Sequence, residues 1–248
     1  MKNLILLCLF GFIGVQPVSA QFGKLIDKAK NSSVGKEAAK VLGDESGDLD
    51  ISGGLKEALE KGVDEAVQSL SATNGYLESP YKILLPAEAQ QVVNKVKKVP
   101  GFGDVEEKLV EKLNRAAETA AVKAKPIFVG AIKKMTFKDA FSILSGKDDA
   151  ATRYLEKNTS TELTGEFKPV IQNSLDEVNA RSYWKTVVTA YNKIPFVKKT
   201  NPELDEYVTE KALEGMFNLV EKKEAGIRTD ISQRSSDLLR RVFEKQDS

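Results

Sequence analysis

Hydrophobic positions recur at helical spacing along most of the chain, and they are densest between residues 202 and 226. On a helical wheel at about 100° per residue, the apolar side chains of this segment cover about 220° of the circumference. They are Leu204, Val208, Ala212, Leu213, Gly215, Met216, Phe217, Leu219 and Val220. Surface helices carry a narrower apolar stripe, so we expect this helix to be enclosed by several neighbours.

The signals at both ends of this segment define the predicted helix. Asn201 is a candidate N-cap, and Pro202 suits the first helical position. The acids of the first turn, which complement the helix dipole, are Glu203, Asp205 and Glu206. Gly226 is the expected stop, because glycine commonly follows the last turn of a helix.

The same periodicity predicts further helices on both sides of this segment. They cover residues 54–70, 86–99, 104–124, 127–135, 140–144, 150–157, 159–179 and 180–192, and a last one runs through Leu238, Leu239, Val242 and Phe243. After a turn at Asn74-Gly75, two prolines between residues 76 and 86 predict an irregular segment pinned to the core. No segment alternates with period two, so the predicted fold is all-α, a single multi-helix bundle packed around residues 202–226.

Short polar motifs mark the expected helix starts. Thr136 to Asp139 and Thr159 to Glu162 both have capping-box spacing. Asp148 or Asp149 is expected to cap the helix at 150–157. These aspartates would also suit Ca²⁺, but their spacing does not match an EF-hand loop, so capping is the favoured explanation. Pro169 is expected to bend the helix that begins at residue 159.

Residues 1–20 have the pattern of a secretory signal peptide. Lys2 is followed by an apolar run of twelve residues, Leu4–Val15, and Val18-Ser19-Ala20 fits a cleavage site with small residues. The run is too short for a bilayer span, which needs about twenty residues. Cys8, the one cysteine, lies inside the run, so we expect a cleaved, non-lipidated protein that is periplasmic or secreted.

Residues 21–51 are expected to form an amphipathic arm and a flexible linker ahead of a helical domain at 52–248. The linker lies in the stretch 43–54, which is rich in glycine, serine and aspartate. The arm, residues 22–42, carries an apolar stripe beside Lys24, Lys28, Lys30, Lys36 and Lys40. An anionic membrane surface, a partner protein and the chain's own domain are all open as its docking place.

The composition excludes several classes of site. The chain has 37 Lys and Arg against 36 Asp and Glu, so no basic excess favours nucleic-acid binding. It has no histidine and no cysteine after the signal, which removes Ser-His-Asp triads, Cys-His pairs and the usual zinc sites. There is no glycine-rich phosphate loop. We therefore assign no catalytic residue, cofactor or metal ligand from the sequence.

Four charged residues are the candidates for a ligand cleft. Arg115 and Glu118 fall on the side of the helix at 104–124 that lies opposite its apolar face. The favoured interpretation is an ion pair at i, i+3 spacing, exposed or between helices, which is worth a few tenths of a kcal/mol. In the alternative interpretation, these two residues face Asp149 and Arg153 across a cleft for an anionic or zwitterionic ligand.

Five segments together resemble a known family. They are GLKEAL (54–59), LNRAAE (113–118), IFVGAIKKMTFKDAFSIL (127–144), GKDDAATRYL (146–155) and YVTEKALEGMF (207–217). In this order they resemble the bacterial domain of unknown function 4197, from about residue 52 to 243. The resemblance implies a helical, exported bacterial domain, and it brings no catalytic residues with it.

The function that these observations favour is non-enzymatic: an envelope-associated interaction or ligand-binding protein. One alternative is a carboxylate-dependent hydrolase acting on envelope glycan or lipid, because paired carboxylates can cleave glycosidic bonds. A second alternative is a membrane-peripheral protein attached through residues 21–42. The sequence is silent on the identity of a partner and on the oligomeric state.

Overall fold

The computed structural model describes residues 51–86, 89–90, 93–94, 103–193, 195–196, 199, 201, 203–234 and 236–244. These residues belong to a compact unit that runs from Asp50 to Ser248. The predicted signal peptide, the arm and the linker up to residue 50 lie outside the described residues, as does most of the helix predicted at 86–99.

Every regular element in the described part of the chain is helical, which confirms the predicted all-α fold. The elements are α3 (Ile51–Ser71), α5 (Val105–Ala121), α6 (Ala124–Lys134), α7 (Phe137–Leu144), α8 (Ala150–Asp176), α9 (Ala180–Tyr191), α10 (Leu204–Thr229), the short 3₁₀ helix η1 (Ile231–Gln233) and α11 (Asp237–Glu244). Residues 51–54, which were assigned to the linker, form the first turn of α3.

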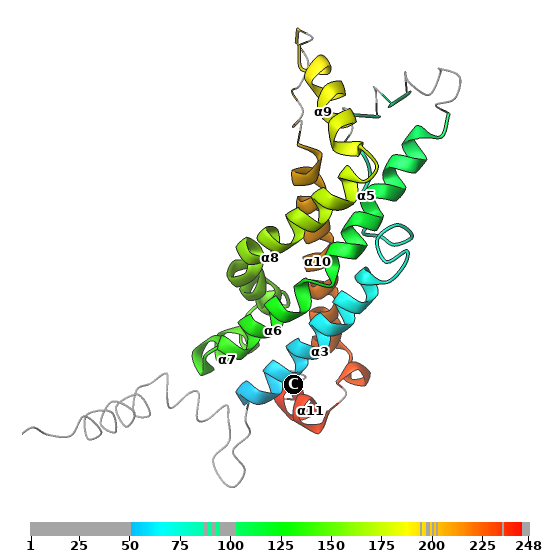
Figure 1. Cartoon of the computed structure of the whole chain (residues 1–248). Helices are drawn as coiled ribbons and strands as arrows, with labels where there is room; N and C mark the ends of the chain where they lie inside the picture. The colour runs from blue at the N-terminus through cyan, green and yellow to red at the C-terminus, as the bar shows by residue number, and fades with distance from the viewer. Residues whose placement is uncertain are drawn as a thin grey trace, which may run out of the picture. The chain divides into compact units, whose positions relative to one another are not determined.

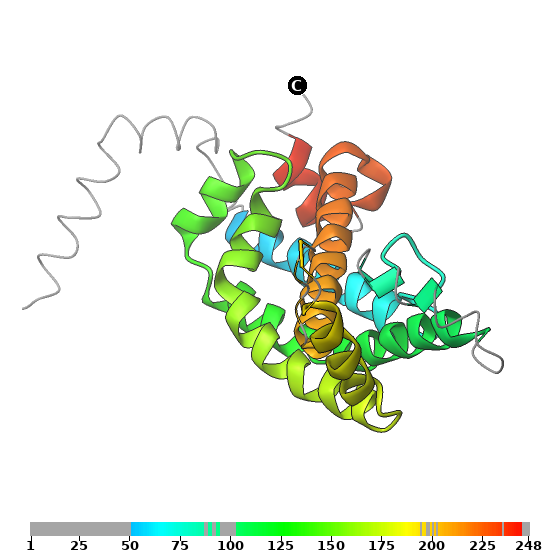
Figure 2. The same ribbon diagram turned by 90° about the horizontal axis from the view of Figure 1, so that it is seen from above.

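Helix α10 is the central element of the bundle. It packs against α8, α3, α5 and α9, and both ribbon views show it lying among these helices (Figures 1 and 2). Met216, Phe217 and Leu219 are 0%, 6% and 8% exposed, which confirms that the wide apolar arc is enclosed. Full burial of side chains of this size contributes about 1.5–3 kcal/mol each.

Both predicted ends of α10 were wrong: the helix begins at Leu204 with Glu203, and not Asn201, at the N-cap position, and it does not stop at Gly226. The helix continues to Thr229, and the backbone N–H of Asp230 donates to the Gly226 carbonyl. The last turn is held by Arg228, which is buried and pairs with Glu224 four residues earlier. Arg228 also donates to the Ile143 carbonyl near the end of α7, and this tertiary bond outweighs the weak preference of glycine for a helix end.

The prediction of two helices at 150–157 and 159–179 was also wrong, because α8 runs without a break from Ala150 to Asp176. Thr159 does not cap a new helix; its hydroxyl donates to the Leu155 carbonyl inside α8, and the residue is 1% exposed. Pro169 lies within the helix. The bend expected there stays a prediction.

A buried stripe explains the continuity of α8. A buried residue recurs at every fourth position along it: Ala151, Leu155, Thr159, Leu163, Phe167, Ile171 and Leu175. Four residues advance about 400° around a helix, so this stripe drifts by about 40° at each step. One helix therefore presents its apolar stripe in turn to α7, α6, α5, α10 and α9, all of which contact α8.

The segment between α3 and α5 is irregular and pinned to the core, as predicted. It begins with a turn in which Asn74 has a φ of 68°, and a Cβ on Gly75 would lie 2.3 Å from the Ser69 carbonyl oxygen. Tyr76 is fully buried and donates from its hydroxyl to the Ala212 carbonyl of α10 at 2.7 Å. Burial, followed by the negative charge of Glu118, raises the pKa of Tyr76, so its phenol stays protonated as a donor.

Asn114 of α5 holds the other end of this segment. Its Oδ1 accepts from the Ile83 N–H at 2.8 Å, and its Nδ2 donates to the Ile83 carbonyl at 2.9 Å. A side-chain amide thus satisfies both backbone groups of a buried residue, as a neighbouring strand would do. Ile83 and Leu85 are buried as a result, whereas Leu84 between them is exposed.

Local capping follows the predicted pattern at α7. Thr136 and Asp139 form a complete capping box, in which each side chain accepts from the other residue's backbone N–H. These hydrogen bonds from Thr136 lower the pKa of Asp139. At α8, in contrast, Asp149 occupies the N-cap position but its side chain makes no capping hydrogen bond.

The first turn of α8 is capped by Glu224 of α10. Its Oε1 accepts from the Ala151 N–H at 2.9 Å, and its Oε2 accepts from the Thr152 N–H at 2.7 Å and from the Thr152 hydroxyl at 2.8 Å. Arg228 pairs with the same carboxylate at 2.9 Å and donates to the Ile143 carbonyl near the end of α7. One buried ion pair therefore joins three helices and complements the positive end of the α8 dipole.

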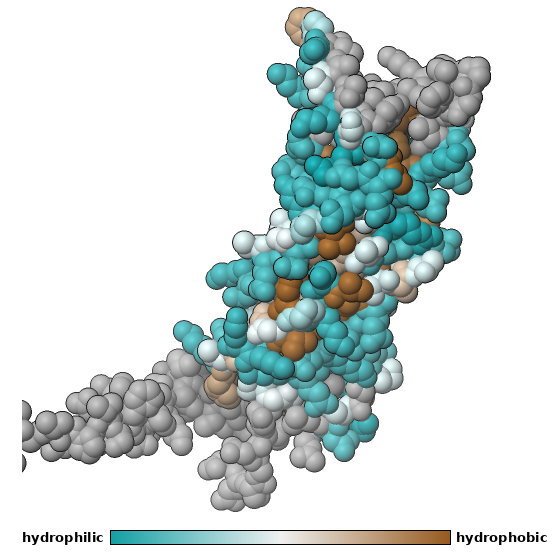
Figure 3. Space-filling view, in the orientation of Figure 1, coloured by the Kyte–Doolittle hydropathy of each residue, from teal (hydrophilic) through white to brown (hydrophobic). Residues whose placement is uncertain are grey.

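The surface is largely hydrophilic on the face shown in Figure 3, with apolar patches over the middle of the bundle. Large apolar side chains that are exposed on the described residues are Leu84, Val122, Phe137, Val178, Phe196 and Ile231. Within the same residues, no helix is long and apolar enough to cross a bilayer.

We expect Glu224→Ala to destabilise the fold by about 3–5 kcal/mol, because it leaves Arg228 buried without its partner and two amides without an acceptor. Urea denaturation followed by circular dichroism measures this loss. Glu221→Gln is the control, since Glu221 also bridges α10 to α8 through its ion pair with Arg153 but is 44% exposed. An exposed ion pair contributes about 0–1 kcal/mol to the free energy of unfolding. Equal losses in the two variants would contradict the capping role.

Asn114→Ala is expected to release residues 76–86 from the core. Both backbone groups of Ile83 lose their partner, at a cost of about 1–3 kcal/mol for each unsatisfied group. Limited trypsin digestion should then cut at the exposed Lys82 much faster than in the wild type. Thr119→Ala, an exposed change on the same helix, is expected to leave the cleavage rate unchanged.

Candidate functional site

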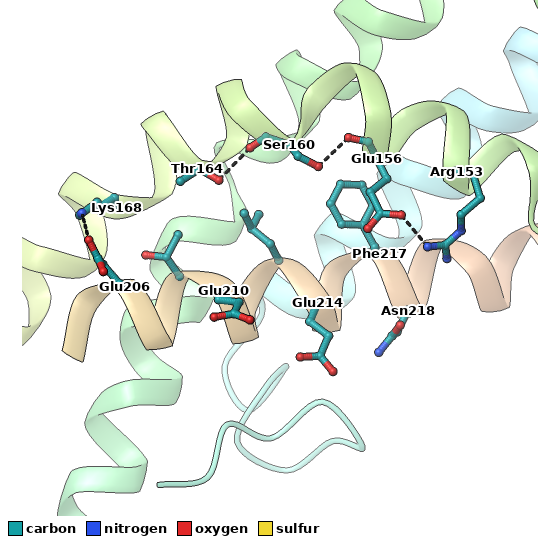
Figure 4. A pocket seen from close by; sticks show the side chains of 12 residues that line it. Arg153, Glu156, Ser160, Thr164, Lys168, Glu206, Glu210, Glu214, Phe217 and Asn218 are labelled. Atoms are coloured by element: carbon teal, nitrogen blue, oxygen red, sulfur yellow. Dashed lines mark hydrogen bonds and ion pairs between the residues drawn. The ribbon is translucent and has the colours of Figure 1, made fainter. Parts of the chain in front are cut away.

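A groove lies between α8 and α10 on the described surface. It has a volume of about 660 Å³. Its lining residues come from these two helices alone: Arg153, Glu156, Ser160, Thr164 and Lys168 from α8, and Glu206, Thr209, Glu210, Leu213, Glu214, Phe217 and Asn218 from α10. Figure 4 shows Phe217 on the side of α10 that faces α8, whereas Glu214 and Asn218 point from α10 away from α8.

Ion pairs close the groove at both ends. At one end Lys168 Nζ lies 2.9 Å from Glu206 Oε1. At the other end Arg153 pairs with Glu156 and with Glu221. The two helices run antiparallel between these pairs, and residues 153 to 168 span about 23 Å at 1.5 Å per residue.

The end near Lys168 is reinforced by a buried carboxylate. Asp205 is 1% exposed, and Gln172 of α8 donates to its Oδ2 at 2.7 Å. Arg181 of α9 lies 3.5 Å from its Oδ1, a distance that favours an electrostatic contact over a hydrogen bond. Together with the cap at Glu224, Asp205 holds α8 against α10 on both sides of the groove.

Part of the acceptor capacity inside the groove is open, although Glu156 and Glu206 already pair with Arg153 and Lys168. The hydroxyls of Ser160, Thr164 and Thr209 all donate to carbonyls four residues earlier in their own helices, which leaves their oxygen lone pairs for other donors. Glu210 makes no hydrogen bond or ion pair within the described part of the chain, although its charge acts on the adjacent Lys211. Glu214 pairs with Lys211 at 2.6 Å on the surface of α10.

The floor of the groove is apolar. Leu213 and Phe217 line it while being only 8% and 6% exposed, so their outer edges face the groove and the rest of each side chain lies in the core. Phe217 is fixed by an edge-to-face contact with Phe128 of α6, with ring centroids 5.8 Å apart. An aromatic ring held in this way is a rigid surface for an apolar or cationic group.

The groove is electrostatically negative. Its lining includes the carboxylates Glu156, Glu206, Glu210 and Glu214 against two cations, Arg153 and Lys168. Both cations already have carboxylate partners, and the hydrogen bond with Glu206 raises the pKa of Lys168. The pKa of Glu206 is lowered by its hydrogen bonds with Asn201 and Lys168, so this carboxylate is charged at neutral pH.

The candidate residues Arg115 and Glu118 lie outside this groove. They form the predicted ion pair, with Arg115 Nη1 2.7 Å from Glu118 Oε2. Glu118 is not on a solvated side of α5 as expected; it is 5% exposed, because the segment after Asn74 covers it. Its Oε1 accepts from the N–H groups of Tyr76 and Leu77. The pair therefore anchors the irregular segment.

The other two candidates lie together at the start of α8. Asp149 Oδ2 is 3.3 Å from Arg153 Nε, and Arg153 lines the groove whereas Asp149 does not. A cleft formed jointly by Arg115, Glu118, Asp149 and Arg153 stays a prediction. No group of acids on the described residues has the arrangement of a metal site.

Sequence reasoning missed most of the groove. Its α8 wall is a row of polar residues at spacings of three or four, from Arg153 to Lys168, and the division of α8 at residue 158 concealed that row. Its α10 wall was seen only as the polar side of an amphipathic helix. The one signal available was that both polar rows are regular at helical spacing.

Comparison with known protein families gives a match over most of the chain. The family model described as a protein of unknown function (DUF4197) matches residues 45–244, which is most of the chain. No curated protein and no solved structure matches significantly. The resemblance inferred from five segments is therefore confirmed, and the chain belongs to the DUF4197 family of proteins of unknown function.

Proposed function

We propose that the protein is a non-enzymatic binding protein of the bacterial cell envelope, and that the groove between α8 and α10 is its ligand site. Export is supported by the signal-peptide pattern of residues 1–20. Binding at the groove is supported above all by one observation. The groove's cations are already paired, whereas its acceptors Glu210, Ser160 and Thr164 remain open.

This imbalance specifies the ligand class. Open carboxylate and hydroxyl oxygens favour a ligand that brings hydrogen-bond donors and positive charge, such as an ammonium or guanidinium group. The apolar floor at Leu213 and Phe217 favours an aliphatic portion next to that charge. The ligand therefore differs from the anionic or zwitterionic one expected for the cleft at Arg153, because that arginine is already neutralised by acids.

The hydrolase alternative has one observation in its favour, which is that acids from α8 and α10 line the same groove. A general acid needs a raised pKa, however, and hydrogen bonds with Asn201 and Lys168 lower the pKa of Glu206, so Glu206 does not suit that role. The membrane-peripheral alternative concerns residues 21–42, which lie outside the described residues. Binding of a cationic ligand is the function that the groove supports best.

Titration calorimetry of the full chain with leucyl-lysine amide tests this function, because the probe combines two ammonium groups with an aliphatic side chain. We expect binding that weakens about tenfold or more in the double variant Glu210→Gln, Glu214→Gln, since a hydrogen bond to a charged group is worth about 1.5–3 kcal/mol.

The matched control is Glu162→Gln, Glu166→Gln, which removes the same charge from exposed positions of α8 outside the groove. Its affinity should equal that of the wild type at moderate salt. Leucyl-glutamate amide is expected not to bind. Absence of binding by the lysine probe, or equal losses in the two double variants, would overturn the assignment of the groove.

A further inference from the structure

Two smaller hollows lie on the other side of α10 from the groove. The first, of about 270 Å³, lies between α10 and residues 80–84. The second, of about 450 Å³, lies between residues 77–84 and α5, where its lining includes Leu77, Leu84 and Val110. Figure 2 shows α10 between α8 on one side and this irregular segment on the other.

The three hollows form one band across α10. Glu214 and Asn218 line both the groove and the first of the smaller hollows. Lys82 and Leu84 line both of the smaller hollows. In Figure 4 the side chains of Glu214 and Asn218 point from α10 toward the pale cyan segment, on the side away from α8. A ligand that fills the groove can therefore extend across α10 at Glu214 and Asn218 and stay in contact with the protein surface.

The band is acidic although the whole chain is close to neutral. Eight carboxylates line it: Glu156, Glu206, Glu210 and Glu214 in the groove, and Glu78, Glu106, Glu107 and Glu111 beside α5. Four cations line it: Arg153, Lys168, Lys82 and Lys211. The full sequence has 37 basic and 36 acidic residues, so the excess of acids is local to this face. Such a face complements a basic partner.

Rigid apolar positions alternate with these charges. Leu84 is 54% exposed and lines both of the smaller hollows. Its carbonyl accepts from the Tyr207 hydroxyl at 2.8 Å, and the adjacent Ile83 is fixed by Asn114. An exposed leucine on a fixed backbone loses little entropy when a partner covers it. With the floor at Phe217, it provides two separate apolar contacts.

Gly215 allows the irregular segment at residues 76–86 to pack closely against α10. A Cβ at this position would lie 3.1 Å from Tyr76 Cε1 and 3.2 Å from Tyr81 Cβ, so the irregular segment packs directly on the α10 backbone. Gly215 and Tyr81 both line the first of the smaller hollows. Close packing here brings that hollow beside the groove.

Building on the function proposed above, we infer that the ligand is an extended, basic segment of a partner polypeptide, which lies across α10 and occupies all three hollows. Acids and apolar contacts that alternate along a band match the alternating side chains of an extended chain. A small amine would occupy only the groove, and a polyamine has no side chains that could contact Leu84 and Phe217.

The test uses the full chain and a twelve-residue peptide, (Lys-Leu-Ser)₄, which reaches about 40 Å when extended. Because it engages several hollows at once, we expect it to bind about 100-fold more tightly than leucyl-lysine amide. The affinity for the peptide should fall about tenfold in the double variant Glu107→Gln, Glu111→Gln and, in a separate variant, in Leu84→Ser. The affinity for the dipeptide should not change in either variant. Glu162→Gln, Glu166→Gln is again the control and should affect neither probe.

The outcomes separate the two proposals. If the peptide binds no more tightly than the dipeptide, or if the changes beside α5 leave its affinity unchanged, the inference of an extended site is wrong. The assignment of the groove as a ligand site is unaffected by that result. If spermine binds as tightly as the peptide and Leu84→Ser has no effect on either, the ligand is a polyamine, which overturns the inference. If neither the peptide nor the dipeptide binds, both proposals fail.

Discussion

The carboxylate of Glu224 at the start of α8 is the interaction on which the arrangement of this bundle depends. It satisfies two backbone amides of α8, pairs with Arg228 and, through that arginine, reaches the end of α7. A buried carboxylate is costly unless it is fully bonded, and this one accepts from three groups besides its salt bridge. Because its bonds are directional, α8 has one register against α10 in which they all form.

That register produces the groove. With α8 fixed at Glu224 and again at Asp205, the two helices run antiparallel, and polar residues of both line the groove between these points. The apolar stripe of α8 turns into the core, so its polar row faces outward along α10. The cations in this row are neutralised by nearby acids, which leaves a surface with open acceptors over an apolar floor. The proposed preference for a basic ligand follows from this geometry.

The apolar part of the fold was predictable from the sequence, whereas its buried polar contacts were not. Periodicity alone located α10 and its buried apolar residues, and local spacing located the capping box at Thr136. Glu224 and Asn114 looked like ordinary polar positions, and Glu118 was considered only as the partner of Arg115 or as part of a cleft. Their backbone partners are 72, 31 and 42 residues away in sequence. A helical wheel describes one helix and contains no information about such partners. The groove was missed for the same reason, since it exists only where two helices meet.

Amide hydrogen exchange at Ala151 and Thr152 tests the central interaction most directly. First-turn amides have no partner within their own helix and normally exchange quickly. With Glu224 as their acceptor, these two amides should exchange as slowly as the core of α10, through unfolding of the whole unit. Exchange as fast as that of exposed first-turn amides would contradict the account.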